Sequence, residues 1–449
     1  MNEWIDAESR AERAQDLYEA GRWAEAAAEL RAAIDMNPYN PSWHFNLGLT
    51  LEALEEYTRA CQAYAAALKL DPNDLETRNC LGVNLTRLGK YAEAMEQFHR
   101  IDRINPRYEP AYCNRIITYT EIGQHDQAEL MFYLARQITD ECPLCFYNIG
   151  NSFYVRRQYD RAIHCWREAL RVDPGHPQAN ARIADAYWAK GDLAQARRHY
   201  ELELQLDEKD VDTLLDLGEL LMEMGEPRAA EEKFRRVLEE APDNAAAHFL
   251  LGELALEQED AVSAAEQFRL VLRIDPKYPG ANARLGRLLL RQRDGKGAVK
   301  HMLAELKNCG DDPETLQELG QLFIESRHTH VANYVLRRVV KLLPDDPCAH
   351  HNLAVSFFML DRLEEGIRHC RKALKLKPEY TLALYNLALA HLHKGQIPRA
   401  RRYAAKALTI APDDEHVRRL SRHLGMMGFW TRLRLRLIPH RRSSSIGNA

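Results

Sequence analysis

The sequence predicts an all-α protein, an α-solenoid in which twelve helix–turn–helix repeats follow one another and a C-terminal helix caps the array. Prolines recur with a period of 34 residues or a multiple of it, at positions 38, 72, 106, 174, 242, 276, 344, 378 and 412. In the same register, small residues recur at two places and apolar residues form two stripes at helical spacing. A fixed period of this length indicates a stack of identical supersecondary units, which favours binding over catalysis.

We number the repeat so that Ala7 is position 1 of the first unit. Two positions of the repeat, 8 and 20, then hold mostly small residues. Position 20 holds eleven alanines and one glycine: Ala26, Ala60, Ala94, Ala128, Ala162, Ala196, Ala230, Ala264, Ala298, Ala332, Gly366 and Ala400. Position 8 holds seven glycines: Gly48, Gly82, Gly150, Gly218, Gly252, Gly286 and Gly320. Glycine costs a helix about 1 kcal/mol relative to alanine, so we expect a steric reason, namely a close approach of two helix backbones.

Each repeat is expected to form a helix, a short turn and a second helix. Positions 4, 7, 8 and 11 make one apolar stripe, positions 20, 24 and 27 make the other, and a glycine often lies between them. The proline ends the second helix because it cannot continue the hydrogen-bond ladder. The Asn or Asp that follows it suits the N-cap of the next helix.

This pattern of small residues at positions 8 and 20, a bulky residue at 24 and proline at 32 resembles the tetratricopeptide repeat. The resemblance covers residues 7–414, and it weakens in the first and last repeats, where Arg13 and Ala404 replace apolar and bulky residues. It implies a right-handed superhelix whose inner wall is lined by the first helix of each repeat. It also implies a protein-interaction scaffold rather than an enzyme.

The chain divides into an N-terminal lead-in (1–6), twelve repeats (7–414), a capping helix (415–427) and a basic aromatic tail (428–449), which we expect to be partly disordered. Net charge is −5, yet residues 415–449 hold eight arginines and one glutamate. The overall balance argues against nucleic-acid binding. Neither a signal peptide nor a membrane-spanning stretch is recognisable, so we expect a cytoplasmic protein, peripheral to a membrane if the tail binds lipid.

We expect no enzymatic activity, cofactor or metal, because the repeats account for residues 7–414 and the remaining segments are too short for a catalytic domain. The nine cysteines are odd in number and irregularly placed, which argues against a disulfide framework and for free, buried thiols. Cys142 and Cys145 form a CxxC whose first member is expected at a helix N-terminus, with a lowered thiol pKa, and Cys113 could lie nearby. A second CxxC that would complete a zinc site is absent from the sequence, so inert cysteines are favoured and a metal or redox sensor is a weaker alternative.

Position 6 carries five asparagines: Asn46, Asn114, Asn148, Asn352 and Asn386. The resemblance implies that this position faces the groove, where a carboxamide both donates to and accepts from the backbone of an extended peptide. The alternative is that asparagine is simply common on solvated helix faces. Aromatic residues at positions 5 and 12 would anchor ligand side chains or pack between neighbouring first helices: Tyr147, Tyr154, Trp188 and Tyr385.

An arginine stripe, Arg284, Arg287 and Arg291, lies between repeats rich in acidic residues. Salt bridges between adjacent repeats are the favoured interpretation. The alternative is that the stripe binds an acidic residue or a phosphate of a partner.

The tail alternates basic and apolar residues after an aromatic pair: Phe429, Trp430, Arg432, Arg434 and Arg436. As a strand it would pair with a partner's sheet edge, and its aromatic and basic residues would suit an anionic membrane. A solubilising end is the plainer interpretation.

The predicted function is a scaffold or adaptor that binds an extended peptide or partner subunit, with a membrane-associated assembly factor as the alternative.

Overall fold

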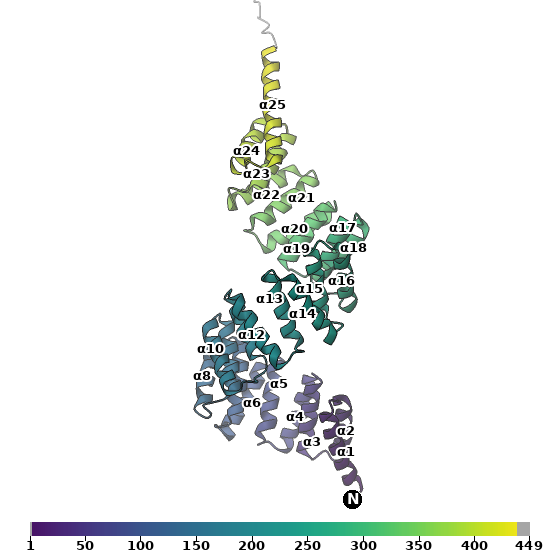
Figure 1. Cartoon of the computed structure of the whole chain (residues 1–449), viewed down its shortest axis with the longest axis vertical. Coiled ribbons are helices and arrows are strands. Elements are labelled where there is room, and N and C mark those ends of the chain that lie inside the picture. The colour runs from purple at the N-terminus through teal and green to yellow at the C-terminus, as the bar shows by residue number, and fades with distance from the viewer. Residues whose placement is uncertain (1, 438–449) are drawn as a thin grey trace, which may run out of the picture. The chain divides into compact units, whose positions relative to one another are not determined.

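The computed structural model describes the backbone of residues 2–437 and the side chains of residues 6–426. Its described residues form helices without any strand (Figure 1). The helices are α1 Asn2–Glu19, α2 Trp23–Met36, α3 Pro41–Ala53, α4 Tyr57–Leu70, α5 Leu75–Arg87, α6 Tyr91–Ile104, α7 Glu109–Ile122, α8 His125–Arg136, α9 Pro143–Val155, α10 Tyr159–Val172, α11 Ala179–Ala189, α12 Leu193–Leu206, α13 Val211–Glu223, α14 Pro227–Glu240, α15 Ala245–Glu257, α16 Ala261–Ile274, α17 Ala281–Arg291, α18 Gly295–Asn308, α19 Pro313–Glu325, α20 Thr329–Leu342, α21 Pro347–Met359, α22 Leu363–Leu376, α23 Thr381–His393, α24 Ile397–Ile410 and α25 Glu415–Leu437.

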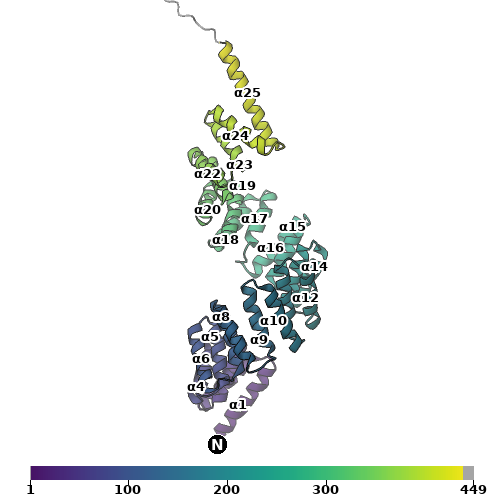
Figure 2. The same ribbon diagram turned by 90° about the vertical axis from the view of Figure 1, so that its left-hand side faces the viewer.

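The predicted helix pairs are confirmed. Each odd-numbered helix up to α23 packs most extensively against the even-numbered helix that follows it, and Figure 2 shows such a pair in α9 and α10. The chain forms two compact parts, an N-terminal part, Met1–Glu240, that contains α1 to α14 and a C-terminal part, Ala241–Ala449, that contains α15 to α25. Apolar clusters run through both parts, as expected for repeats that bury their faces against neighbours.

The small residues have the steric role that the sequence predicts. Every alanine at position 20 has an exposed fraction of 0%. Each glycine at position 8 faces the position-24 side chain of its own repeat: a Cβ on Gly218 would lie 2.3 Å from Phe234 Cε1, and one on Gly150 would lie 2.5 Å from Trp166 Nε1. The glycine therefore makes room for a large side chain of the second helix.

The turn between the two helices requires a left-handed residue at position 15 of every repeat. Six repeats place glycine there, and the other six place Glu55, Arg157, Glu259, Arg293, Arg327 and Asp361, with φ between 58° and 65°. A left-handed conformation costs a residue with a Cβ about 1–2 kcal/mol. Half of the turns therefore have a less favourable backbone than the glycine turns.

The predicted caps are present at position 34. The side chains of Asn40, Asp74, Asp210, Asn244, Asp312, Asp346 and Asp414 accept hydrogen bonds from backbone N–H groups of the following helix. In the fifth repeat the sulfur of Cys142 takes this place and accepts from the N–H of Cys145 at 3.3 Å.

Both ends of the described backbone are helical. α1 begins at Asn2, so the lead-in is helical. α25 buries Val417, Leu420 and Leu424 as the predicted cap, but it continues through residues 428–437 to Leu437. Residues 428–437 are therefore helical, because leucine and arginine are good helix formers and neither Gly425 nor Gly428 ends the helix. Pairing of this segment as a strand with a partner's sheet edge stays a prediction. None of the described helices is both long and apolar enough to span a bilayer.

Candidate interaction surface and cysteine cluster

First helices of successive repeats contact one another along a stretch of each part. In the N-terminal part α5 contacts α7 and α7 contacts α9, and in the C-terminal part α17, α19, α21 and α23 contact one another in succession. Among the described helices, second helices of successive repeats make no contact of comparable extent. The first helices therefore lie on the inner side of the bend within each part, and we call this surface the first-helix wall.

Three of the predicted asparagines join first helices across repeats. Asn114 Nδ2 donates to Asn79 Oδ1 at 3.0 Å, and Asn386 Nδ2 lies 2.9 Å from His351 Nε2. Asn148 is nearly buried, and its Nδ2 lies 3.5 Å from the carbonyl oxygen of Cys113. In each case the side-chain amide at position 6 lies within hydrogen-bonding distance of the residue at position 5 of the preceding repeat. Part of the hydrogen-bonding capacity of these amides is therefore used within the chain.

The other two asparagines have different surroundings. Asn352 Oδ1 lies 3.4 Å from His351 Nδ1. Asn46 lines a cavity of about 210 Å³ together with Tyr18, Leu49 and Thr50. A role of all five asparagines in binding the backbone of a peptide stays a prediction.

The predicted aromatic residues are half-buried on the first-helix wall. Tyr147 stacks on His176 with ring centroids 4.7 Å apart, and Tyr154 lies against Trp166 at 6.0 Å. Trp188 meets Tyr200 edge to face at 6.5 Å. Tyr385 packs against the apolar cluster beneath α25. Packing between helices thus accounts for one side of each ring and leaves the remaining surface accessible.

An acidic cluster surrounds Trp188, where the carboxylates of the acid-rich seventh repeat lie close to Asp185 of the sixth. Trp188 Nε1 donates to Glu223 Oε2 at 2.6 Å, and the hydroxyl of Tyr200 donates to Asp185 at 2.5 Å. Burial, reinforced by the neighbouring Asp185 and Glu219 carboxylates, raises the pKa of Asp216 to about 7. Among the described side chains, Arg182 is the one cation that forms an ion pair with this cluster, at 3.1 Å from Asp185, so negative charge is in excess here.

The arginine stripe has the salt bridges that the sequence favours. Arg284 reaches Glu253 at 2.8 Å and Glu318 at 2.9 Å, and Arg287 also reaches Glu318, at 2.7 Å. Arg291 is exposed and has no ion pair among the described side chains. Arg287 and Arg291 line a cavity of about 500 Å³ between α17 and α19. Binding of an acidic or phosphorylated partner there stays a prediction.

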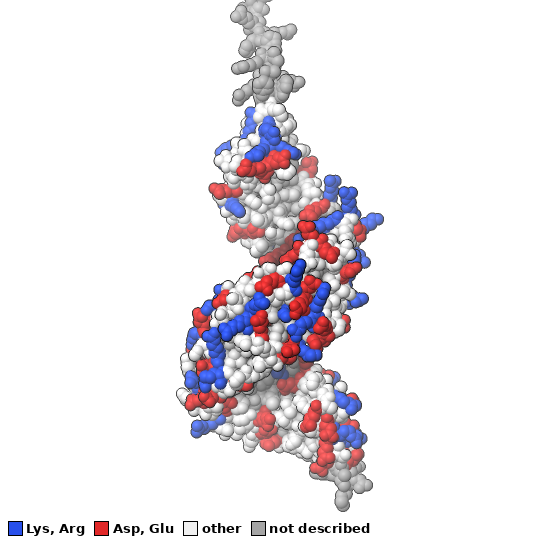
Figure 3. All heavy atoms as spheres, in the orientation of Figure 1, with Lys and Arg blue, Asp and Glu red and all other residues white. Residues whose placement is uncertain are grey.

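Charge of both signs is mixed over the visible surface. On the face shown in Figure 3, lysine and arginine side chains alternate with aspartate and glutamate over both parts. Such interspersed charge produces little long-range field of one sign on this face. Local clusters such as the one around Trp188 are therefore better candidates for a binding site than this face as a whole.

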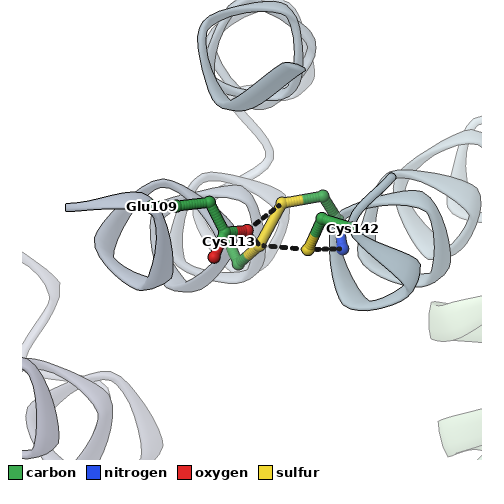
Figure 4. A group of neighbouring side chains, drawn as sticks. Glu109, Cys113 and Cys142 are labelled. Atoms are coloured by element: carbon green, nitrogen blue, oxygen red, sulfur yellow. Dashed lines mark hydrogen bonds between the residues drawn. A yellow bond between two sulfur atoms is a disulfide. The ribbon is translucent and has the colours of Figure 1, made fainter. Parts of the chain in front are cut away.

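The cysteines differ from the prediction. Cys113 and Cys145 form a disulfide, and the Cys142 sulfur lies 3.5 Å from the Cys113 sulfur (Figure 4). The expectation of free thiols is wrong for this pair because the repeats stack α7 beside α9, whose N-terminal turns then meet. The lowered thiol pKa expected for Cys142 is also wrong: burial and the Glu109 carboxylate raise its pKa to about 12.

The sequence analysis anticipated three members of the cysteine cluster but not Glu109. Glu109, Cys113 and Cys142 stand at positions 1, 5 and 34 of the fourth repeat, and Cys145 at position 3 of the fifth. Aligning the repeats shows that these four positions hold no cysteine elsewhere, which is a signal of local specialisation.

The five predicted tail residues, Phe429, Trp430, Arg432, Arg434 and Arg436, lie outside the described side chains, so their contacts stay a prediction.

Comparison with known proteins bears out the resemblance. Family models described as tetratricopeptide repeat match residues 12–74, 147–211 and 215–279, and a further one matches residues 357–424, so that more than half of the chain is covered. The chain belongs to the tetratricopeptide repeat family. Such repeats serve as protein-interaction scaffolds.

Individual relatives are distant. Protein bimA of Emericella nidulans is 28% identical over 116 residues, which are 25% of this chain and 14% of that protein. A chain of the APC/C hetero-tetramer Cut9–Hcn1 has 13% identity and a TM-score of 0.44, over 92% of this chain and 95% of its own. Yeast Tom70 has 13% identity and a TM-score of 0.39, over 97% of each chain. PilF of Pseudomonas aeruginosa has 19% identity and a TM-score of 0.40, over 45% of this chain and 92% of its own.

Proposed function

We propose that this tetratricopeptide repeat protein is a non-enzymatic scaffold that holds an extended, basic segment of a partner protein along α9, α11 and α13. The observation that carries the proposal is the acidic cluster on the first-helix wall, where Asp185, Asp216, Glu219 and Glu223 face one nearby cation, Arg182. Half-buried aromatic rings border these carboxylates.

The raised pKa of Asp216 explains why a basic ligand suits this surface. Its carboxylate has lost solvent and lies close to other carboxylates, so its charged form is disfavoured in the free protein. A lysine or arginine from a partner would supply the missing positive charge and form a charge-assisted hydrogen bond. The partly exposed rings of Tyr154 and Trp188 would contact the apolar stems of the same side chains.

A catalytic role has weaker support. His125 Nδ1 lies 2.9 Å from Ser152 Oγ, which is the geometry of a base beside a nucleophile. Ser152 is fully buried, however, so a substrate could not reach its hydroxyl. We interpret the pair as a contact that joins α8 to α9.

The proposal is tested with a fluorescein-labelled Lys-Ala peptide and a matched Glu-Ala peptide, by fluorescence anisotropy with the full chain. We expect the basic peptide to bind and the acidic one not to bind. Asp216→Asn should weaken binding of the basic peptide about fivefold, since a partly exposed ion pair contributes roughly 1 kcal/mol.

Asp126→Asn is the matched control, because Asp126 lies on the second helix α8 with its side chain 92% exposed. It should leave the affinity unchanged. Equal affinity for both peptides, or equal losses in the two variants, would overturn the proposed site.

A further inference from the structure

We propose that Glu109, Cys113, Cys142 and Cys145, with their thiols reduced, form a binding site for one thiophilic divalent cation of the zinc type. On this proposal the Cys113–Cys145 disulfide is the oxidised, metal-free form of the same site. The inference is independent of the peptide-binding surface.

The four residues come as two pairs from adjacent repeats. Glu109 begins α7 and Cys113 lies one turn later, while Cys142 caps α9 and Cys145 lies in its first turn. Their four ligand atoms lie within 4.8 Å of one another. Sulfurs bound to one tetrahedral zinc ion, with Zn–S bonds of about 2.3 Å, are separated by roughly 3.8 Å, so small side-chain rotations would suffice.

A structural disulfide by itself leaves two of the four residues unexplained. Glu109 Oε1 lies 2.9 Å from the Cys113 sulfur and 3.3 Å from the Cys145 sulfur, although disulfide sulfurs have no hydrogen to donate to a carboxylate (Figure 4). The third cysteine, Cys142, is buried against the same group. A cation between the carboxylate and three thiolates would satisfy all four residues at once.

Comparison between the repeats shows that the cluster replaces ordinary repeat residues. The capping position that holds Cys142 is Asp or Asn in seven other repeats, and a thiol is a weaker acceptor than their side chains. None of the other repeats has glutamate at position 1 or cysteine at positions 3, 5 or 34. The substitutions therefore occur together at one junction, as a shared ligand would require.

The surroundings suit a bound cation. Cys113, Cys142 and Cys145 have exposed fractions of 5%, 9% and 1%, so bound metal would be shielded from water. The N–H of Cys145 already points at the Cys142 sulfur, and such a bond is stronger to a metal thiolate than to a thiol.

The disulfide form converts into the metal-bound form by two balanced steps. A dithiol reductant transfers two electrons and two protons to the disulfide, giving two cysteine thiols and the cyclic disulfide of the reductant. Binding of the divalent cation to three thiols and the ionised Glu109 then releases three protons.

The test uses the full chain, reduced with dithiothreitol, freed of the reductant without oxygen and loaded with zinc in the presence of a competing chelator. We expect elemental mass spectrometry to find one zinc ion per reduced chain and none in the oxidised chain. The zinc-loaded chain should have three fewer reactive thiols than the reduced, metal-free chain. Cobalt in place of zinc should give the visible absorption of tetrahedral coordination with thiolate charge transfer.

Cys145→Ser should lose zinc retention, and Glu109→Gln should weaken it at least tenfold. Cys61→Ser is the control, because Cys61 is a free thiol on α4 outside the cluster. Helical circular dichroism before metal loading shows whether each variant is folded. A reduced wild-type chain that retains no zinc, or folded Cys145→Ser and Cys61→Ser variants that retain zinc equally, would refute the proposal.

Discussion

The contact between Gly218 and Phe234 gives a prediction whose sign depends on the background in which it is measured. In the wild-type chain a methyl group at position 218 would lie 2.3 Å from Phe234 Cε1 and 2.8 Å from Cδ1, closer than real Cβ contacts. Overpacking of this kind costs about 1–3 kcal/mol. Alanine gains about 1 kcal/mol of helix propensity over glycine. We therefore expect Gly218→Ala to lower the local free energy of unfolding by up to about 2 kcal/mol.

The same substitution should stabilise the protein once the ring is removed. Phe234 is fully buried, so Phe234→Ala alone should cost about 3–5 kcal/mol. In that background the added methyl at position 218 meets no ring, and the propensity gain of about 1 kcal/mol is unopposed. The two substitutions should therefore couple by about 1–3 kcal/mol.

Native-state hydrogen exchange of the full chain, read by mass spectrometry on peptides from α13 and α14, measures these local free energies. It suits a repeat array, in which different regions open separately. Gly425→Ala is the control, because a Cβ there meets nothing within 4 Å and only the propensity gain should appear. If Gly218→Ala changes stability by the same amount in both backgrounds, within about 0.5 kcal/mol, the packing argument fails.

Three further predictions concern other regions. Arg157→Gly should stabilise the α9–α10 turn by about 1 kcal/mol in hydrogen exchange, because φ is 58° there, and a loss of protection would contradict the strain assigned to this turn. The folded-state pKa of Asp216, about 7, lies above its unfolded value, so its contribution should make the protein less stable as pH rises from about 4 to 7. The free energy of unfolding in urea, measured at both ends of this pH range, should fall more in the wild type than in Asp216→Asn. The difference should be about 1 kcal/mol after solvent screening, and an equal pH dependence in the two proteins would refute the assignment. Removal of residues 428–449 should abolish co-sedimentation with anionic vesicles if the tail binds membrane, each arginine contributing about 1 kcal/mol, and binding that is retained would exclude the tail as the anchor.

The sequence predicts the helices well because their determinants lie within single repeats. Gly150 and Trp166 are in the same repeat, and their complementary sizes are visible in the aligned positions. Salt bridges such as that between Arg284 and Glu318 are also predictable, because the same position recurs one period later with the opposite charge.

Contacts between repeats were harder to predict because they depend on the rotation of one helix against the next. Asn114 and Asn79 meet at different positions of their repeats, so periodicity alone does not pair them. The same is true of Cys113 and Cys145, which are 32 residues apart rather than one full period. The raised pKa of Asp216 depends on its burial and on its distance to Asp185 of another helix, α11, and the residue pattern predicts neither.

The close packing of helices only with near neighbours has a consequence for biosynthesis. Every extensive contact joins a helix to the next one along the chain or to the one after it. Such low contact order lets native structure form without waiting for distant segments. The earliest repeats are therefore expected to fold on the ribosome while later ones are still being translated.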